Sequence, residues 1–433
     1  MEKTLNVAVL GAGTVGSQVI RLIEEKNGEL AARSGAKLRI SAVVVRDVHA
    51  PRDYDVPREV LTTDAETAID EADIVIELIG GIEPAFTFVK RALSNGATVV
   101  TGNKALLAQH GPELYELTAT NDTDLYYEAA VAGAVPIVYG LRESLAGDTV
   151  NRVVGIVNGT TNFILDQMHT TGASYEEALK EAQDLGFAEA DPSADVDGLD
   201  AAAKCALMAS LAFHSRVAMD DVAVEGITSI TSKDMEEAAR TGFAIKLLAV
   251  AERRTDDAGT DGIGVRVHPT LVPLTHPLAT VSGAFNAVVL ECESAGRLMF
   301  YGQGAGGAPT ASAVLGDVVA GASHRVHGGH APRESRYAQL PILDPGTART
   351  RYQMRLRVED RAGVLSEVSG IFARHGVSIL AVTQHQIDRH REAEIVLSTH
   401  TTREADLEAV ADALGKSNAV LSVESVLRVE GDG

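Results

Sequence analysis

The segment Gly11-Ala12-Gly13-Thr14-Val15-Gly16 constrains the fold of this chain more than any other feature of its sequence. It directly follows an apolar run, Leu5 to Leu10, and opens a helical pattern that extends to about Lys26. In that setting the three glycines allow a tight turn, a close approach of the backbone to a pyrophosphate, and close helix packing. The N-terminus of the following helix offers unpaired N–H groups to the phosphates. The sequence therefore predicts an N-terminal dinucleotide-binding domain.

Strands and helices alternate through the first 140 residues, a pattern typical of a parallel sheet with helices on both faces. A segment at 309–323 is again helical, and we expect it to pack back on this domain. We therefore predict an α/β, doubly wound, Rossmann-type domain over residues 1–140, with a return segment at 309–335. Its expected strands are 5–10, 40–45, 73–79 and 97–100, and its expected helices are 14–26, 84–94 and 104–118.

The residues that end the second expected strand bear on the choice of cofactor. An acidic side chain there suits the ribose hydroxyls of NAD, whereas an arginine suits the 2′-phosphate of NADP. The sequence has both, Arg46 followed by Asp47, so NAD stays an alternative. Because Arg46 comes first we favour NADP, although either side chain can equally be a solvated surface charge.

From about residue 141 the regular alternation gives way to Ala-rich helical stretches mixed with strand-like runs, which predicts an α+β domain over residues 141–308. The polar stretch from His324 to Arg351 has little periodicity and is typical of a connector. Residues 350–433 show the order of a ferredoxin-like βαββαβ domain. The expected elements of the second domain are helices at 175–184, 198–214 and 234–253 and strands at 152–157, 263–272 and 285–291.

Asp200 and Lys204 form the most informative local feature, because their spacing places them on one face of an otherwise apolar helix, DGLDAAAKCALMASLAF (197–213). The alternative is a surface salt bridge of little consequence. Leu207 and Leu211 share this face, however, and a helix that is apolar all round is normally buried. A buried charge is costly unless paired, so the pair indicates a function. A lysine poised between burial and a carboxylate can exchange a proton with a substrate hydroxyl.

Composition excludes several classes of protein. The formal charge of −22 repels phosphate backbones, so we expect no nucleic-acid partner. The chain has two cysteines, no long apolar segment and too short an N-terminal apolar run for a signal peptide, so we expect a cytoplasmic protein without a membrane span. Cys205 is interpreted as packing. His324, His327 and His330 are not assigned to a metal, because no ordered element is expected to fix them.

Five blocks of this sequence resemble the homoserine dehydrogenase family, in the family's order, over residues 1 to about 320. They are GAGTVG (11–16), TGNKALLA (101–108), NGTTNFIL (158–165), LGFAEADPSADVDGLDAAAK (185–204) and GQGAGGAPTASAVLGD (302–317). The resemblance implies NAD(P)-dependent interconversion of L-homoserine and L-aspartate 4-semialdehyde, in threonine, methionine and isoleucine biosynthesis. It also implies that the protein is a homodimer or a homotetramer. The domain at 141–308 would bind the substrate and form the dimer interface.

The same resemblance implies roles for single residues. Lys204 would be the general acid/base and Lys104 a second essential lysine near nicotinamide and substrate. Glu189 and Asp200 would bind homoserine, with backbone from Gly186 and support from Asp195. The cofactor would meet Gly11, Gly13, Thr14, Val15, Gly16, Gly80 and Gly304. A monovalent cation, usually sodium, would be held in YYEAAVAGAVP (126–136) by Glu128, Val131, Gly133 and Val135, the valines through their carbonyls.

The C-terminal unit, with VEDRAGVLSEVSGIFARHGVSI (358–379), resembles an ACT domain. Asp360, Arg361 and Gly363 would lie at the turn where such domains bind amino acids between paired copies, and the implied ligand is threonine as a feedback inhibitor. We expect the form without a fused aspartokinase domain. Three other functions are possible. Another dinucleotide-dependent amino-acid dehydrogenase would not need the block at 185–204, and a non-catalytic metabolite sensor would not need a buried ionic pair. The third alternative is a structural protein.

Overall fold

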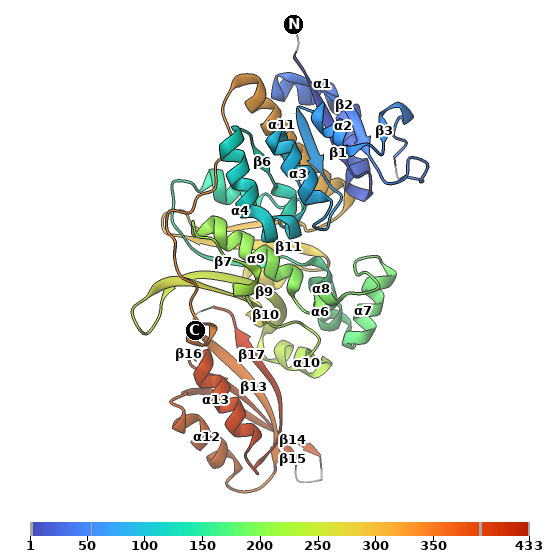
Figure 1. Ribbon diagram of the computed structural model, residues 1–433. Coiled ribbons are helices and arrows are strands. Elements are labelled where there is room, and N and C mark those ends of the chain that lie inside the picture. Colours follow the sequence, from blue (N-terminus) through green and yellow to red (C-terminus); the bar gives the residue numbers. More distant parts are fainter. Residues whose placement is uncertain (1–2, 53, 389–391, 432–433) are drawn as a thin grey trace. The chain divides into compact units, whose positions relative to one another are not determined.

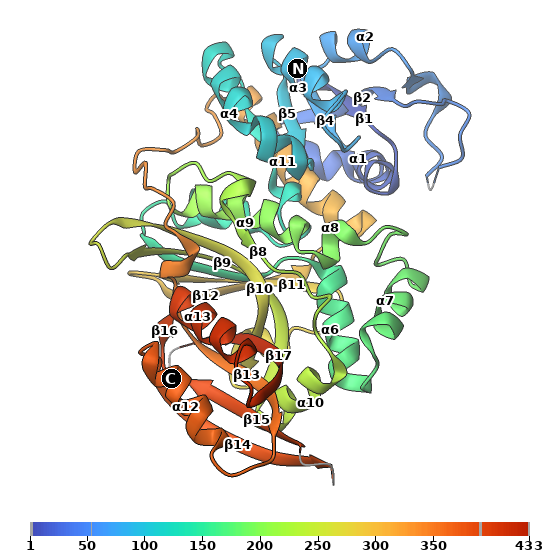
Figure 2. The same ribbon diagram turned by 60° about the horizontal axis from the view of Figure 1, so that its bottom comes forward.

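The computed structural model describes residues 3–52, 54–388 and 392–431, which fall into two compact units. Unit 1 comprises Met1–Gly159, Asp200–Val222 and Ala284–Gln339. Unit 2 comprises Thr160–Leu199, Ala223–Gly283 and Leu340–Gly433. Their elements are labelled in Figures 1 and 2.

A six-stranded parallel sheet of order β3-β2-β1-β4-β5-β6 forms the first half of unit 1 (Figure 1). The strand order reverses between β1 and β4, as in dinucleotide-binding sheets, and the predicted Rossmann-type fold class is confirmed. Strands β4 and β5 are buried throughout, because parallel strands are covered on both faces. The elements are β1 (Lys3–Leu10), α1 (Thr14–Ser34), β2 (Ala36–Val44), β3 (Leu61–Thr62), α2 (Ala65–Asp70), β4 (Ile74–Glu77), α3 (Ala85–Ser94), β5 (Thr98–Thr101), α4 (Lys104–Asn121) and β6 (Leu125–Tyr126).

The helix expected at 309–323 is α11 (Gly307–His327), which packs on α1, while α2, α3 and α4 pack in sequence on one another. Val314, Val318 and Ala322 of α11 share a buried core with Val19 and Ile23 of α1. One prediction is wrong here, because the connector does not begin at His324. The apolar helical pattern continues to His327, and the Nδ1 atom of His324 lies 2.6 Å from the hydroxyl of Tyr126.

The second half of unit 1 holds an antiparallel group of three strands, β7 (Val150–Ile156), β11 (Phe285–Cys292) and β12 (Gly296–Gln303). Strand β12 was not predicted, because its run Leu298 to Tyr301 is apolar without the period-2 alternation of a half-buried strand. Helix α9 (Leu199–Ala212) carries the expected charged pair and is buried at most positions. The shorter elements are η2 (Glu128–Ala130), α5 (Ile137–Tyr139) and η3 (Gly140–Ser144).

Unit 2 contains a sheet of order β9-β10-β17-β13-β15-β14. The helix predicted at 234–253 is wrong in its second half: α10 (Ser232–Thr241) ends at Gly242, whose φ is +85, and β9 (Phe243–Thr255) follows at once. The Ala- and Leu-rich composition of β9 favours a helix, but pairing with β10 (Asp261–Pro273) along all 13 residues overrides that preference. The other elements here are α6 (Gly159–Thr171), α7 (Tyr175–Asp184), α8 (Ser193–Val196) and β8 (Ala223–Val224).

The C-terminal βαββαβ domain has the strand order β17-β13-β15-β14, which confirms the predicted ferredoxin-like fold class. Its core lies between the sheet and two helices, and centres on Tyr352, Phe372 and Leu407. Its outer strand β17 also pairs in parallel with β10, through Thr270↔Arg428 and Leu271↔Val429. The elements are β13 (Arg349–Glu359), α12 (Val364–Arg374), β14 (Ile379–Asp388), β15 (Glu392–Thr399), β16 (Thr402–Arg403), α13 (Glu404–Gly415) and β17 (Val420–Val429).

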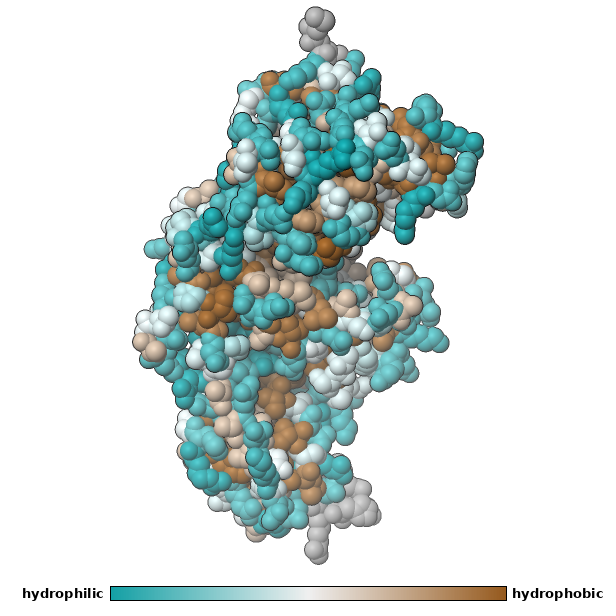
Figure 3. Space-filling view, in the orientation of Figure 1, coloured by the Kyte–Doolittle hydropathy of each residue, from teal (hydrophilic) through white to brown (hydrophobic). Residues whose placement is uncertain are grey.

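The surface of the chain is largely hydrophilic. Hydrophilic residues cover much of the face shown in Figure 3, with apolar patches between them. Within the described residues, no helix combines the length and the apolar character needed to span a bilayer.

Candidate functional site

The glycine turn after β1 is shaped by contacts with neighbouring backbone. Gly11 has a φ of +99, and its N–H donates to the carbonyl oxygen of Val44 at 2.9 Å. A Cβ at Gly16 would lie 2.1 Å from the carbonyl oxygen of Gly11, so a larger residue would push the turn open. Gly13 is exposed, and a Cβ there would have no atom within 4 Å. The space beside Gly13, at the N-terminus of α1, fits a phosphate group.

The residues predicted to contact the cofactor follow the carboxyl ends of neighbouring strands. Gly11 follows β1, Gly80 follows β4 with a φ of +76, and Lys104 follows β5. Ligands of doubly wound sheets bind at this edge, where the strand order reverses. The fold thus gathers segments that lie far apart in the sequence at one edge of the sheet.

The loop that carries Gly304 lies beside this edge. A Cβ at Gly133 would lie 2.3 Å from the carbonyl oxygen of Gly304, and one at Gly307 would lie 3.1 Å from the carbonyl oxygen of Thr14. Thr14 is exposed and Val15 is half-buried in the first turn of α1. The structure therefore places Gly304 next to the loop of Gly133, and the start of α11 next to the start of α1.

Asp200 joins the two predicted lysines into one cluster. Its Oδ1 lies 2.8 Å from the Nζ of Lys104, and its Oδ2 lies 2.7 Å from the Nζ of Lys204. Burial by itself would raise the pKa of the Asp200 carboxyl, but the two ammonium groups hold that pKa well below its usual range. Asp200 is therefore ionised at neutral pH, and it links α9 to the first residue of α4.

Two groups that were not predicted complete the cluster. The side-chain amide of Asn158 donates to Oδ2 of Asp200 at 2.8 Å, and the Nζ of Lys204 donates to the carbonyl oxygen of Val157 at 2.7 Å. Both belong to the turn between β7 and α6. Asn158 belongs to the family block NGTTNFIL (158–165), but nothing in the sequence places its side chain opposite Asp200.

The exposure of the two lysines shows what the cluster can do. Lys204 is nearly enclosed, with 11% of its side chain exposed, whereas Lys104 keeps 42%. An ammonium group has three N–H donors, and Lys204 gives two of them to Asp200 and Val157. Among the described residues the third N–H has no partner, so it remains for a hydroxyl oxygen of a ligand. A lysine held in this way can give or take a proton at that oxygen.

Three predicted substrate residues belong to unit 2. Gly186 ends the turn after α7 with a φ of +77, and Glu189 is exposed, with its carbonyl oxygen bonded to the side chain of Gln183 at 3.1 Å. Asp195 lies half-buried in α8. Their contact with substrate stays a prediction.

The loop predicted to hold a cation is buried and has oxygen atoms available. Among the described residues, the carbonyl oxygens of Val131 and Gly133 accept no hydrogen bond, while that of Val135 accepts the N–H of Ile137 at 2.8 Å. The Glu128 carboxylate accepts the N–H groups of Val138 and Tyr139 at 2.9 and 2.7 Å. Carbonyl and carboxylate oxygens are the ligands that hard cations prefer.

A second acid lies beside this loop. Asp317 of α11 accepts the N–H of Glu128 at 2.9 Å, and its buried Oδ1 has no hydrogen-bond partner among the residues that the structure describes. Burial raises the pKa of Glu128 to about 7 and that of Asp317 well above its usual range. A cation next to these two carboxyl groups would stabilise their ionised forms, so the residues present fit such an ion.

Arg46 and Asp47 follow the end of β2 and are both exposed. The Asp47 carboxylate accepts the N–H of His49 at 2.8 Å, which engages it in a local turn. Arg46 forms no ion pair with another described residue. Its guanidinium group is therefore available to a ligand at the edge of the sheet.

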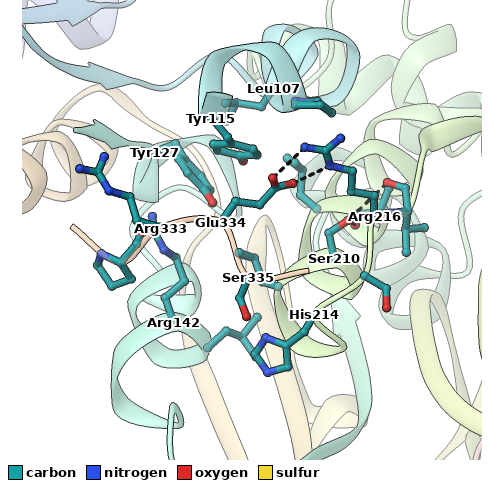
Figure 4. A pocket seen from close by; sticks show the side chains of 18 of the residues that line it. Leu107, Tyr115, Tyr127, Arg142, Ser210, His214, Arg216, Arg333, Glu334 and Ser335 are labelled. Atoms are coloured by element: carbon teal, nitrogen blue, oxygen red, sulfur yellow. Dashed lines mark hydrogen bonds and ion pairs between the residues drawn. The ribbon is translucent and has the colours of Figure 1, made fainter. Parts of the chain in front are cut away.

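A cavity of about 480 Å³ lies elsewhere in unit 1 and contains neither lysine of the cluster (Figure 4). Its charged groups are engaged: Arg216 forms a bidentate pair with Glu334 at 2.7 and 2.8 Å, and Arg142 stacks over the ring of Tyr127. These groups already have partners within the protein, so they offer less to a small charged substrate than the lysine cluster does. The Lys104–Asp200–Lys204 cluster is therefore the stronger candidate for a site of chemistry.

Family comparisons agree with this division of the chain. Residues 136–319 match the family model described as homoserine dehydrogenase, and residues 11–128 match the NAD-binding domain of homoserine dehydrogenase. Residues 352–417 match the ACT domain. The matched segments together span most of the chain.

Similar proteins match over all or most of the chain. A homoserine dehydrogenase of Corynebacterium glutamicum is 51% identical over 430 residues, which cover 99% of this chain and 96% of that protein. The crystal structure of a homoserine dehydrogenase from Thiobacillus denitrificans has a TM-score of 0.91 at 36% identity, covering 100% of this chain and 99% of the other. A hyperthermophilic archaeal homoserine dehydrogenase in complex with NADPH has a TM-score of 0.60 at 27% identity, covering 73% of this chain and 97% of the other.

Proposed function

Because this chain belongs to the homoserine dehydrogenase family, oxidoreductases that act on the CH–OH group of homoserine, we propose that Lys204, Asp200 and Lys104 carry the reaction. The observation that supports this assignment is the pair of contacts, 2.7 and 2.8 Å, that join both lysines to one buried carboxylate. The reaction interconverts L-homoserine and L-aspartate 4-semialdehyde. In biosynthesis it would serve threonine, methionine and isoleucine formation in the cytoplasm.

In the proposed mechanism Lys204 moves the proton. When bound, the nicotinamide cofactor would supply the hydride acceptor. The neutral amine of Lys204 accepts the proton of the substrate hydroxyl, and Asp200 stabilises the ammonium that results. In the reverse direction that ammonium protonates the nascent alkoxide. Lys104, which is more exposed, places a second positive charge beside the reacting oxygen, while Gly186, Glu189 and Asp195 are proposed to bind and support the substrate.

The test of this function is an absorbance assay with homoserine and each nicotinamide cofactor. We expect reduced cofactor to accumulate only when homoserine is present, and other amino acids with a hydroxyl group to give no comparable rate. A metabolite sensor without activity would bind the cofactor and give no substrate-dependent signal. A rate with another amino acid and none with homoserine would indicate a different dehydrogenase.

We propose NADP as the preferred cofactor, with Arg46 meeting the 2′-phosphate; the archaeal relative was solved with NADPH. Arg46→Ala is expected to raise the KM for NADP by about tenfold, since a hydrogen bond to a charged group contributes about 1.5–3 kcal/mol. The KM for NAD should change less than twofold. Steady-state kinetics with both cofactors measure this, with Arg33→Ala, an exposed arginine of α1, as the control. Equal changes in the KM values for NADP and NAD would show that Arg46 does not determine the cofactor preference.

We also propose a monovalent cation, sodium by preference, in the loop of Glu128, Val131, Gly133 and Val135. The free carbonyl oxygens and the two buried acids described above support it. It would fix the loop that contacts the Gly304 segment.

For the ACT domain we propose threonine as feedback inhibitor, bound near Asp360, Arg361 and Gly363 between paired copies in a homodimer or homotetramer. Contacts within unit 2 support a route from this domain to the block at 185–199. Arg428 of β17 pairs with Glu225 at 2.6 Å, and Ile227 donates its N–H to the carbonyl oxygen of Val196 at 2.8 Å. Gly226 between them is so close that a Cβ would lie 2.3 Å from that same oxygen.

This route predicts that Glu225→Gln weakens inhibition by threonine. Without the ion pair, a conformational change in β17 has less effect on the substrate-binding segment. We therefore expect the threonine concentration for half-inhibition to rise at least fivefold, which corresponds to a loss of about 1 kcal/mol of coupling free energy between the two sites. Uninhibited turnover should stay within twofold. Glu424→Gln is the matched control, because Glu424 contacts Arg355 within the ACT domain, at 3.8 Å. Unchanged inhibition in Glu225→Gln would contradict the route.

A further inference from the structure

A single buried hydroxyl, that of Thr101, connects two parts of the proposed site. Thr101 is the last residue of β5 and is fully buried. Its Oγ1 donates to Oε2 of Glu77 at 2.6 Å and accepts the backbone N–H of Asn103 at 3.0 Å. The hydroxyl therefore acts as donor and acceptor at once, between the ends of β4 and β5 and the start of α4.

Glu77 organises the other side of this connection. It ends β4 with no exposed surface, and no described lysine, arginine or histidine lies within ion-pair distance of it. Its Oε1 accepts the N–H groups of Ile79 and Gly80 at 2.8 and 3.2 Å. A buried carboxylate without a cation is costly unless N–H and O–H donors satisfy it. The donors here are the turn of Gly80 and the hydroxyl of Thr101.

Asn103 relays the connection to Lys104. It is the N-cap of α4: its Oδ1 accepts the N–H of Leu106 at 3.1 Å, and its Nδ2 donates to the carbonyl oxygen of Gly81 at 2.7 Å. Lys104 is the next residue and the first of the helix. Its Cα position therefore depends on the N-cap, which Thr101 and Gly81 hold in place.

We propose that Thr101 and Glu77 are positioning residues that hold Lys104 in register with the Gly80–Gly81 turn. This inference rests on the proposed function, because Lys104 must act in the reaction for its position to affect the rate. The network gives the two sides of the site, the turn after β4 and the lysine after β5, one shared support. A rotation of α4 by a fraction of a turn would move the Nζ of Lys104 away from Asp200.

A double-mutant cycle tests the proposal. Thr101→Val keeps the size of the side chain and removes the hydroxyl, so we expect kcat with homoserine to fall about tenfold while the KM for the cofactor changes less than twofold. Thr101→Ser keeps the hydroxyl and should recover turnover to within twofold of the unmodified protein. In the Lys104→Ala background, Thr101→Val should lower the residual kcat by less than twofold.

Thr98→Val is the matched control. Thr98 is almost as buried as Thr101 and lies on the same strand, but among the described residues the contact of its hydroxyl is with Arg325, at 3.5 Å. This variant should keep kcat within twofold. Equal losses in Thr98→Val and Thr101→Val, or a tenfold loss from Thr101→Val in both backgrounds, would show a general packing effect and overturn the proposal. Full turnover in Lys104→Ala would instead contradict the proposed function of that lysine.

Discussion

Lys204→Ala is expected to lower kcat by about 10²–10⁴-fold, the range that a positioned general acid/base contributes. The side chain is almost enclosed and has two of its three N–H donors engaged, so no other group of α9 can replace it. Cofactor binding should stay nearly intact, because the glycine turn lies after β1. Steady-state turnover and a fluorescence titration with reduced cofactor measure the two quantities separately.

Lys204→Arg separates proton transfer from charge. Arginine keeps a positive group opposite Asp200 but does not lose its proton at accessible pH. It should fold like the unmodified protein and lose turnover as severely as Lys204→Ala. Lys246→Met controls for the loss of a buried lysine: Lys246 is 3% exposed and donates to the carbonyl oxygen of Val281 at 2.6 Å and to Oδ1 of Asn162 at 3.2 Å, neither of which belongs to the cluster. The turnover of Lys246→Met should remain within a few-fold of that of the unmodified protein. Normal turnover in Lys204→Ala would show that Lys204 takes no part in the reaction.

Gly13→Ala is expected to weaken cofactor binding at least tenfold, which corresponds to about 1.4 kcal/mol, without loss of stability. The backbone of Gly13, with φ −77 and ψ −160, is open to any residue, and a Cβ there meets no protein atom within 4 Å. The methyl group would instead occupy the space where a pyrophosphate approaches the turn. Isothermal titration with NADP and NAD, together with thermal unfolding, measures both effects.

Gly28→Ala is the matched control for this substitution. Gly28 lies inside α1, the helix for which Gly13 is the N-cap, and a Cβ there also has no atom within 4 Å. Alanine in a helix should raise stability by about 0.5–1 kcal/mol and leave cofactor affinity unchanged. If Gly13→Ala binds both cofactors as tightly as Gly28→Ala does, the pyrophosphate does not approach this turn.

The sequence was most informative where one segment determines its own structure. The glycines after β1 specify a strand–turn–helix locally, and the Asp200–Lys204 spacing fixes a shared helical face before any tertiary contact is known. The βαββαβ order of the C-terminal domain was likewise legible from local patterns. These features defined the fold class and two members of the proposed catalytic cluster.

Contacts between distant segments could not be predicted in the same way. Lys104 and Asp200 are 2.8 Å apart across almost a hundred residues of chain, and Asn158 approaches Asp200 from a third element. Thr101 looks like an ordinary strand residue until its partners Glu77 and Asn103 are placed beside it. Strand β9 was mistaken for helix, because its Ala-rich composition favours a helix until β10 pairs with it.

Rescue of Lys204→Ala by small primary amines tests the proposed role of Lys204 most directly. If the amine of that side chain carries the proton, then methylamine or ethylamine in the assay should restore turnover in proportion to its concentration of free base. The same amines should not affect Lys204→Arg, whose side chain fills the space. The opposite result would be that no amine restores the turnover of Lys204→Ala while amines do rescue Lys104→Ala. That result would assign the proton transfer to Lys104 and contradict the proposed mechanism.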